Sequence, residues 1–378
     1  MKNKRPKIPP KTQVKLWTLA AGRCEFFGCN KVLWRDDLTF SEGNYSNIAH
    51  IISWIPNGPR GDKILSPKLA KDISNLMLVC RDHGSLIDQK QNLSRFTVEL
   101  LRTYKQNHEK RIMIQTSIKE ELKTQIVRFQ CNIRGRRIEV PFTDAYSGII
   151  DAGRYPTDEK GILIDLTKVD YSADESFWKS ASVQISNTIT RELAPKNDGD
   201  APSHFSIFGL APIPLLIYLG YCLGSGIAAD LYLRPHSSSR WYLNDVKTRH
   251  QIRIKVSRSN IKSKSKKIAL IISLSGVADP GSITKGWPIY NIFISRPNVD
   301  SLKSQKDINV FRSVYRQVLA EIRDKYGGKS EVHIFAAVPP AAAILCGREV
   351  IHGVDPPLFL YEHGNQNGFH FVLKINNK

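Results

Sequence analysis

The chain has 378 residues, of which 41% are hydrophobic and 24% are charged, a composition typical of a soluble globular protein with two or three domains. Its six cysteines are too few for a disulfide scaffold, and three of them have the spacing of metal ligands, which favours a reducing cytoplasm. The basic N-terminus lacks the apolar run of a signal peptide, so we expect none. The net charge is +20, and residues 1–120 hold 21 Lys and Arg against 11 Asp and Glu, the surplus that a phosphate-binding surface needs.

Two pairs of metal-ligand residues flank the first long apolar segments. A helix predicted over 13–21 leads into Cys24 and Cys29, which are spaced C-x4-C, and Cys80 and His83 follow as C-x2-H. Three thiols and one imidazole form a common closed tetrahedral zinc site. We therefore expect a structural Zn²⁺ that links two distant parts of a small domain.

A histidine and an asparagine lie between these two pairs. His50 ends the β-like run 47–51, and Asn75 begins a second apolar run. A neutral imidazole can take a proton from a water that attacks a phosphodiester, and Asn75 can orient the loop that carries the histidine. The simpler alternative makes His50 a core histidine and Asn75 a turn residue. The flanking zinc ligands favour catalysis.

The order His50, Asn75 and Cys-x2-His resembles the HNH (His-Me finger, ββα-metal) nucleases, many of which carry a structural zinc. The resemblance implies an endonuclease domain over residues 1–116. It also implies Mg²⁺ or another divalent ion on the scissile phosphate. Two positions depart from the family pattern, because Ala49 stands where many members have Asp and Gly84 where many have a second His.

Because of these two departures, the family pattern does not identify the ligands of the catalytic ion in this chain. Asp88 lies four residues after Gly84, on the same face of the predicted helix, and is our candidate carboxylate. Asp36 or Asp37 could supply a further oxygen. In the rival assignment, His83 binds the catalytic ion and the zinc keeps three ligands. The turn-rich loop 57–62 could present Arg60 to a DNA backbone.

The rest of the chain is predicted to be a duplicated α/β domain, after a linker over 117–127. Apolar runs alternate with amphipathic helices, and Phe208/Phe335, Pro212/Pro339 and Gly220/Gly347 are each 127 residues apart. Upstream, we align strand 161–167 with 268–275 and helix 177–193 with 310–326. The halves are then about 128–250 and 251–378, with a shared crevice at the strand ends.

One stretch of the first half could be mistaken for a membrane helix. Residues 205–229 are free of charge and long enough to cross a bilayer. The stretch is interrupted by Pro212, Pro214, Gly220, Gly224 and Gly226, and a proline inside a helix costs about 3 kcal/mol. We expect strand, turn and buried helix here, and no membrane partner.

The end of the chain resembles a SAVED domain, a family of two fused CARF-like Rossmann-type halves that sense cyclic oligonucleotides. The resemblance lies in the run Phe335–Ala343, the pair Gly347-Arg348 and residues 356–362. HNH followed by SAVED is the layout of effector endonucleases of CBASS, an antiphage signalling system. It implies a cyclic di- or trinucleotide activator, ligand-driven homo-oligomers from dimer to tetramer, and nonspecific cleavage of double-stranded DNA.

Such a ligand needs cations and N–H groups near its phosphates and aromatic faces near its bases. From their places near predicted strand ends we select eight candidates: Thr167, Lys168, Arg234, Trp241, Tyr242, Ser275, Arg348 and Tyr361. For Tyr361 and Arg348 the alternatives are a buried strand aromatic and a surface charge.

Two other functions fit parts of the sequence. The chain could be an HNH restriction-type endonuclease that recognises modified DNA without a messenger. It could also be a catalytically dead zinc protein that regulates by binding DNA, as Ala49 and Gly84 would permit. The repeat argues against the first, and His50 with Asn75 against the second.

Overall fold

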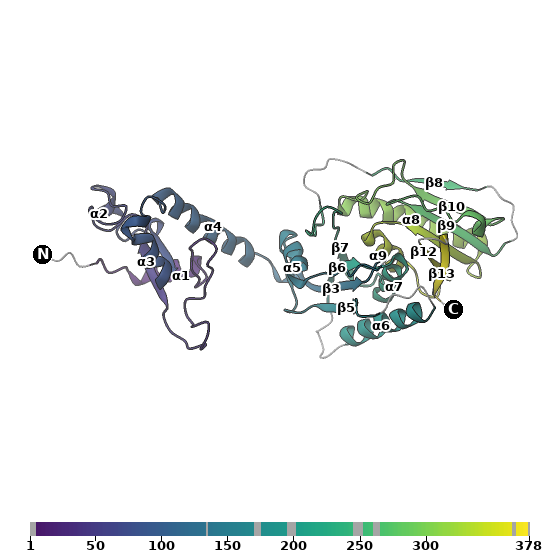
Figure 1. Cartoon of the computed structure of the whole chain (residues 1–378), viewed down its shortest axis with the longest axis horizontal. Coiled ribbons are helices and arrows are strands. Elements are labelled where there is room, and N and C mark those ends of the chain that lie inside the picture. Colours follow the sequence, from purple (N-terminus) through teal and green to yellow (C-terminus); the bar gives the residue numbers. More distant parts are fainter. Residues whose placement is uncertain are drawn as a thin grey trace. The chain divides into compact units, whose positions relative to one another are not determined.

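The computed structural model describes residues 5–133, 135–169, 175–194, 202–244, 252–259, 265–364 and 368–376. The chain divides into two compact units, Met1–Ile118 and Lys119–Lys378 (Figure 1). Each unit has its own hydrophobic core.

The first unit is built on an antiparallel strand pair followed directly by a helix. Strand β1 (Ser46–His50) pairs with β2 (Leu76–Cys80), so that His50 lies opposite Leu76, and α3 (Arg81–Asp88) begins where β2 ends. All five residues of β2 are buried. This ββα arrangement places the end of β1, the start of β2 and one helix in a single small module.

Further helices surround this module. Helix α1 is longer at its start than predicted, because Pro10 occupies its first position, where the missing N–H of proline costs nothing. Leu16 of α1 and Leu101 of the last helix reach the core of the unit. The elements are α1 (Pro10–Leu19), α2 (Leu65–Leu69), η1 (Ile73–Asn75), η2 (Lys90–Asn92) and α4 (Val98–Thr116).

The second unit contains two sheets with the same central topology. The first has the parallel order β5-β3-β6-β7, and the second has the parallel order β10-β9-β11-β12. The first set is β3 (Lys123–Cys131), β5 (Ile162–Leu166), β6 (His204–Leu210) and β7 (Ala228–Leu231). The second set is β9 (Lys267–Ser273), β10 (Ile289–Phe293), β11 (Glu331–Ala337) and β12 (Leu358–Gly364).

Short or antiparallel strands extend both sheets. They are β4 (Tyr155–Pro156) beside the start of β3, β8 (Lys255–Arg258) beside β10, and β13 (Gly368–Ile375) beside β12. The helices are α5 (Phe142–Asp151), α6 (Glu175–Leu193), α7 (Ile213–Leu223), α8 (Gln305–Tyr326) and α9 (Pro340–Arg348), with 3-10 turns η3 (Glu120–Leu122) and η4 (Gly281–Thr284). Helices α7 and α9 pack on each other between the two sheets (Figure 1).

The topology corrects two predictions. Strand 162–166 (β5) corresponds to β10, and not to 268–275. Each of these two strands pairs with the first strand of its half, on the side away from the remaining parallel strands. The first strand is β3 in one half and β9 in the other. The predicted linker 117–127 also contains the start of β3, where Ile126 and Val127 are buried in the sheet.

The charge-free stretch 205–229 forms most of β6, all of α7 and the start of β7. No helix in the described part of the chain is both long and apolar enough to span a membrane.

Candidate functional sites

The four predicted zinc ligands lie together in the first unit. The ligand atoms of Cys24, Cys29, Cys80 and His83 are all within 4.8 Å of one another. His83 Nδ1 lies 3.1 Å from Cys80 Sγ and 3.7 Å from Cys24 Sγ. Tetrahedral zinc holds sulfur at about 2.3 Å and nitrogen at about 2.0 Å. One zinc ion therefore fits this donor set.

The surroundings of the cluster fix the ligands in place. The ring of Phe26 stacks on His83 with centroids 4.0 Å apart, and the Cys80 N–H donates to Cys24 Sγ. Burial raises the pKa of the Cys24 thiol well above its usual range. A thiolate at this buried position therefore needs a cation beside it, which a bound zinc ion would supply.

His50 is held in one tautomer at the end of β1. Its side chain is buried, and Nε2 lies 3.0 Å from the carbonyl oxygen of Ala70. A carbonyl only accepts hydrogen bonds, so Nε2 carries the proton and Nδ1 keeps its lone pair. Burial lowers the pKa of His50, which keeps the ring neutral near pH 7. A neutral imidazole with an Nδ1 lone pair has the chemistry that a general base needs.

The side-chain amide of Asn75 hydrogen-bonds the backbone of two segments that lie next to the His50 imidazole. Its amide bonds Ile52 twice, with Nδ2 donating to the carbonyl and Oδ1 accepting from the N–H, both at 2.8 Å. Nδ2 also donates to Leu69 O at 3.3 Å. Leu69 precedes the Ala70 carbonyl that binds His50. Asn75 thus fixes the turn after His50 and the loop that orients its ring.

Arg60 does not face DNA as predicted, because its side chain is only 4% exposed. Its guanidinium donates to Ile51 O at 2.7 Å, to Ile87 O at 2.6 Å and to Asp88 Oδ1 at 2.6 Å. Arg60 therefore connects the end of β1 to the end of α3.

The two candidate carboxylates for a catalytic ion have different surroundings. Asp88 is paired with Arg60, and its charge acts on His50, raising the pKa of that ring. Asp36 caps its own turn, accepting from the N–H groups of Leu38 and Thr39. Among the described residues, the Cys/His cluster is the one group of three or more ligands close enough to share an ion. Neither Asp36 nor Asp88 belongs to it.

Gly84 lies against β1. A Cβ on this residue would come within 2.3 Å of Asn47 Nδ2. A histidine at position 84 would therefore displace the Asn47 side chain. Glycine at this position, in place of a second histidine, lets α3 pack closely against β1.

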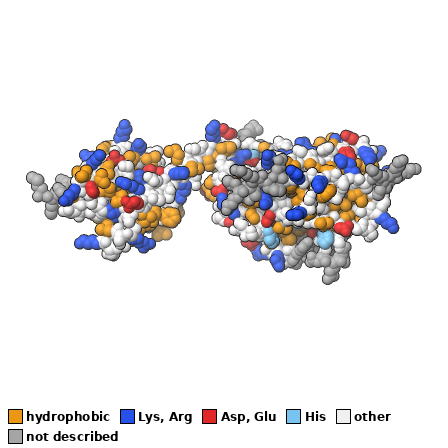
Figure 2. Space-filling view, turned by 90° about the horizontal axis from the view of Figure 1, so that it is seen from above, with side chains coloured by type: hydrophobic (Ala, Val, Ile, Leu, Met, Phe, Trp, Pro, Cys, Tyr) orange, Lys and Arg blue, Asp and Glu red, His pale blue; other side chains and the backbone are white. Residues whose placement is uncertain are grey.

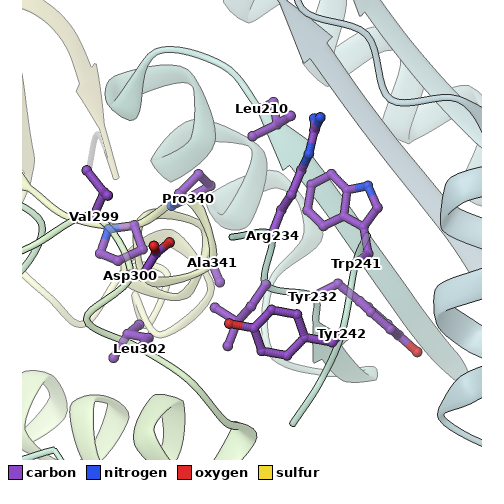
Figure 3. Close-up of a pocket in the computed structure, with 12 residues that line it drawn as sticks. Leu210, Tyr232, Arg234, Trp241, Tyr242, Val299, Asp300, Leu302, Pro340 and Ala341 are labelled. Atoms are coloured by element: carbon purple, nitrogen blue, oxygen red, sulfur yellow. The ribbon is translucent and has the colours of Figure 1, made fainter. Parts of the chain in front are cut away.

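The second unit has a cavity at the carboxyl ends of its strands, as predicted. The cavity has a volume of about 370 Å³, and a narrow slot of about 30 Å³ shares six of its lining residues. Both halves line it: Figure 3 shows Arg234 and Trp241 on one side and Asp300 and Pro340 on the other. The shared residues are Leu210, Arg234, Val299, Asp300, Pro339 and Pro340.

Four of the eight predicted ligand-binding residues line these spaces. Arg234 lines both, Ser275 lines the larger one, and Trp241 and Tyr242 line the slot. Trp241 is buried, and the guanidinium of Arg234 lies 5.9 Å from the centre of its ring. These side chains offer a cation, a hydroxyl and aromatic surface in one place.

The other four residues lie elsewhere. Arg348 is buried and donates to Ile227 O at 2.6 Å, so it is neither a surface charge nor a ligand contact. The hydroxyl of Tyr361 lies 2.9 Å from His333 Nδ1. Thr167 donates to Asp165, and Lys168 is exposed next to it. None of them lines either space.

Sequence reasoning missed Asp300 and His236, which also line the larger cavity. Asp300 Oδ1 accepts the N–H of His236 at 3.0 Å, which joins the halves across the cavity. Asp300 follows β10, a strand that the predicted alignment left out. The apolar run 289–294 was the signal that could have located it.

The fold and cavity define a two-lobed α/β ligand-binding module. Residues 185–375, about half of the chain, match SAVED, described as the SMODS-associated and fused to various effectors sensor domain. The chain therefore belongs to the SAVED family, which confirms the predicted sensor domain over this range. No curated protein matches the chain.

Among solved structures, the chain is similar to Cap4 SAVED/CARF-domain containing receptors. One from Acinetobacter baumannii, with the cyclic trinucleotide 3'3'3'-cAAA, is 12% identical with a TM-score of 0.44, covering 78% of this chain and 62% of that chain. One from Moraxella osloensis is 14% identical with a TM-score of 0.39, covering 76% and 60%. The chain thus spans about three fifths of the length of these two receptors.

Proposed function

We propose that this chain is an antiphage effector in which a cyclic oligonucleotide activates a DNA endonuclease. The sensor half of the proposal is supported by membership of the SAVED family and by the cavity between its halves. The nuclease half is supported above all by one observation, the Ala70 carbonyl that leaves His50 Nδ1 with its lone pair. The activator class is a cyclic di- or trinucleotide, and activation involves assembly into homo-oligomers.

The proposed reaction is hydrolysis of a phosphodiester. His50 Nδ1 takes a proton from a water whose oxygen attacks phosphorus, the bond to the leaving sugar oxygen breaks, and that oxygen takes a proton from solvent. A divalent ion, when bound, would stabilise charge on the phosphate oxygens. Asp88 is the carboxylate whose charge acts on His50. Zinc would be held by Cys24, Cys29, Cys80 and His83 and would have a structural role.

The surface near His50 suits a polyanionic substrate. Lys63, Lys68 and Lys71 are exposed on the segment that includes Ala70. Lys and Arg side chains are spread over the face of the first unit seen in Figure 2, with few Asp and Glu. Such a surface attracts duplex DNA without reading its sequence.

In the sensor unit, Arg234 would bind a phosphate of the cyclic ligand, and Trp241 and Tyr242 would contact a base. A guanidinium forms two parallel hydrogen bonds to a phosphate, and aromatic rings stack on bases. Ser275 and Asp300, on the opposite half, would hydrogen-bond the ligand across the cavity. Ligand binding would then depend on both halves at once.

One experiment tests the function. Purified protein is incubated with plasmid and Mg²⁺, Mn²⁺ or Ni²⁺, with and without a panel of cyclic di- and trinucleotides. We expect cleavage only with ligand, and none from His50→Ala, which should still bind the ligand. A matched control is His108→Ala, a buried histidine whose Nε2 contacts Ala20 O instead.

The other outcomes support other functions. Cleavage without ligand would indicate a restriction-type enzyme. No cleavage under any condition would favour a zinc-containing DNA-binding regulator, a candidate supported by the Cys/His cluster and by the pairing of Asp88 with Arg60. Cleavage by His50→Ala would refute the assignment of the base.

A further inference from the structure

The segment before α1, residues 5–9, is anchored to the first unit. Ile8 is 7% exposed and belongs to the core. The side chain of Gln13 donates to the Ile8 carbonyl at 2.8 Å, and the Gln13 N–H donates to Pro9 O. This arm is therefore held against the body of the unit, and its exposed side chains have defined positions.

The anchored arm places a guanidinium beside β1. Arg5 Nη2 donates to the carbonyl of Ile48, two residues before His50 on the same strand. Two charges also act on the His50 ring: Arg5 lowers its pKa and Asp88 raises it. Each of these effects on the pKa is smaller than that of burial. Arg5 itself is exposed.

Arg60, a second arginine near His50, is already engaged. Arg60 uses its guanidinium on three backbone carbonyls, one of them that of His50 itself, and on Asp88, and its side chain is 4% exposed. A guanidinium has five N–H donors, and Arg5 uses one of its terminal nitrogens on Ile48. Of the two arginines whose described hydrogen bonds reach β1 or the residue after it, Arg5 is thus the one with donors available to a substrate.

We propose that Arg5 binds the scissile phosphate and stabilises the negative charge that develops there during cleavage. This inference rests on the proposed nuclease function and adds a residue to it. Water attack at phosphorus concentrates charge on the non-bridging oxygens, and a guanidinium binds two such oxygens through parallel N–H bonds. The arm then closes the site from the side of β1, while the loop with Ala70 orients His50.

The test compares Arg5→Ala and Arg5→Lys with Lys11→Ala, which removes one exposed charge from the start of α1. The readouts are kcat and KM for ligand-activated plasmid cleavage. Removal of one such donor lowers kcat by about 100-fold, with a smaller change in KM. The kcat of Arg5→Lys should lie between those of the wild type and Arg5→Ala, because lysine keeps the charge but cannot form two parallel hydrogen bonds to the phosphate. The kcat of Lys11→Ala should stay within about twofold of the wild-type value.

Chemical rescue distinguishes substrate binding from a structural effect. Guanidinium ion at millimolar concentration should restore part of the activity of Arg5→Ala, whereas sodium chloride at the same ionic strength should not. A wild-type rate for Arg5→Ala, or equal effects in Arg5→Ala and Lys11→Ala, would overturn the proposal and leave the nuclease function intact.

A second measurement does not require cleavage. Titration with the dinucleotide dTpdT should shift the His50 ring resonances of the wild type in NMR spectra, and should not shift those of Arg5→Ala. Equal shifts in both proteins, or none in the wild type, would exclude a phosphate site at Arg5. If the wild type fails to cut DNA with any ligand, the nuclease proposal fails, and this titration alone decides whether Arg5 binds a phosphodiester.

Discussion

Gly220 and Gly347 occupy reciprocal positions where α7 crosses α9. A Cβ on Gly220 would lie 1.9 Å from the carbonyl oxygen of Ile344, and a Cβ on Gly347 would lie 1.8 Å from that of Ile217. Both glycines and both isoleucines are 127 residues apart in sequence. The crossing therefore lies on the pseudo-twofold axis of the sensor unit, and only glycine lets the two backbones meet.

Gly220→Ala and Gly347→Ala should each destabilise the second unit. The added methyl meets backbone rather than a flexible side chain, so the helices must separate, and overpacking of this kind costs about 1–3 kcal/mol or more. The measurement is the free energy of unfolding in urea. Gly226→Ala is the control, because its Cβ would meet nothing within 4 Å. Equal stability of all three variants would contradict the close crossing.

Cys80→Ser should release zinc and unfold the first unit. Structural zinc sites supply much of the folding free energy of small domains, and Cys80 joins the end of β2 to the first cysteine pair. Metal content by mass spectrometry and thermal unfolding are the readouts. Cys222→Ser, outside the cluster, should keep its zinc. A folded first unit with bound zinc in Cys80→Ser would argue against the four-ligand site.

The acid limb of the cleavage rate should lie below pH 6.5, the ordinary value for histidine. Burial is the largest cause of the lowered pKa of His50, with Arg5 adding to it and with the Ala70 hydrogen bond and Asp88 opposing it. The base is neutral above this pKa, so activity is lost as the pH falls through it. A pH profile of kcat/KM provides the measurement. In Arg5→Ala the limb should move to higher pH.

The lowered pKa of His50 also makes the free energy of unfolding depend on pH. The pKa of His50 is lower in the folded than in the unfolded chain, so the unfolded chain binds more protons between the two values. The contribution of His50 is therefore complete above about pH 6.5 and decreases as the pH falls. The difference between wild type and His50→Ala in urea unfolding at several pH values isolates it. No pH dependence in that difference would contradict the burial.

Arg234→Gln should weaken binding of the activating cyclic nucleotide by about tenfold or more, because a charge-assisted hydrogen bond contributes about 1.5–3 kcal/mol. Titration calorimetry measures the affinity. Arg240→Gln is the matched control, since Arg240 is exposed, pairs with Asp151 and lines neither the cavity nor the slot. Equal affinities for the two variants would place the ligand elsewhere.

The sequence by itself determined the features that depend on local spacing and residue type. Two short ligand pairs indicated the Cys/His cluster, and a constant offset of 127 residues identified β6 with β11 and α7 with α9. The SAVED resemblance followed from the same segments. These features are readable because each is encoded within a few consecutive residues.

Only the tertiary structure decided which distant groups meet. The offset between the halves changes upstream, so the equivalence of β5 with β10 appears only in the strand order. The orientation of His50 comes from the Ala70 carbonyl, which every residue possesses and no side-chain pattern reveals. Arg60 and Arg348 became buried because backbone carbonyls accept their N–H groups. Backbone hydrogen bonds between distant segments depend on the completed fold, and therefore sequence patterns alone could not predict them.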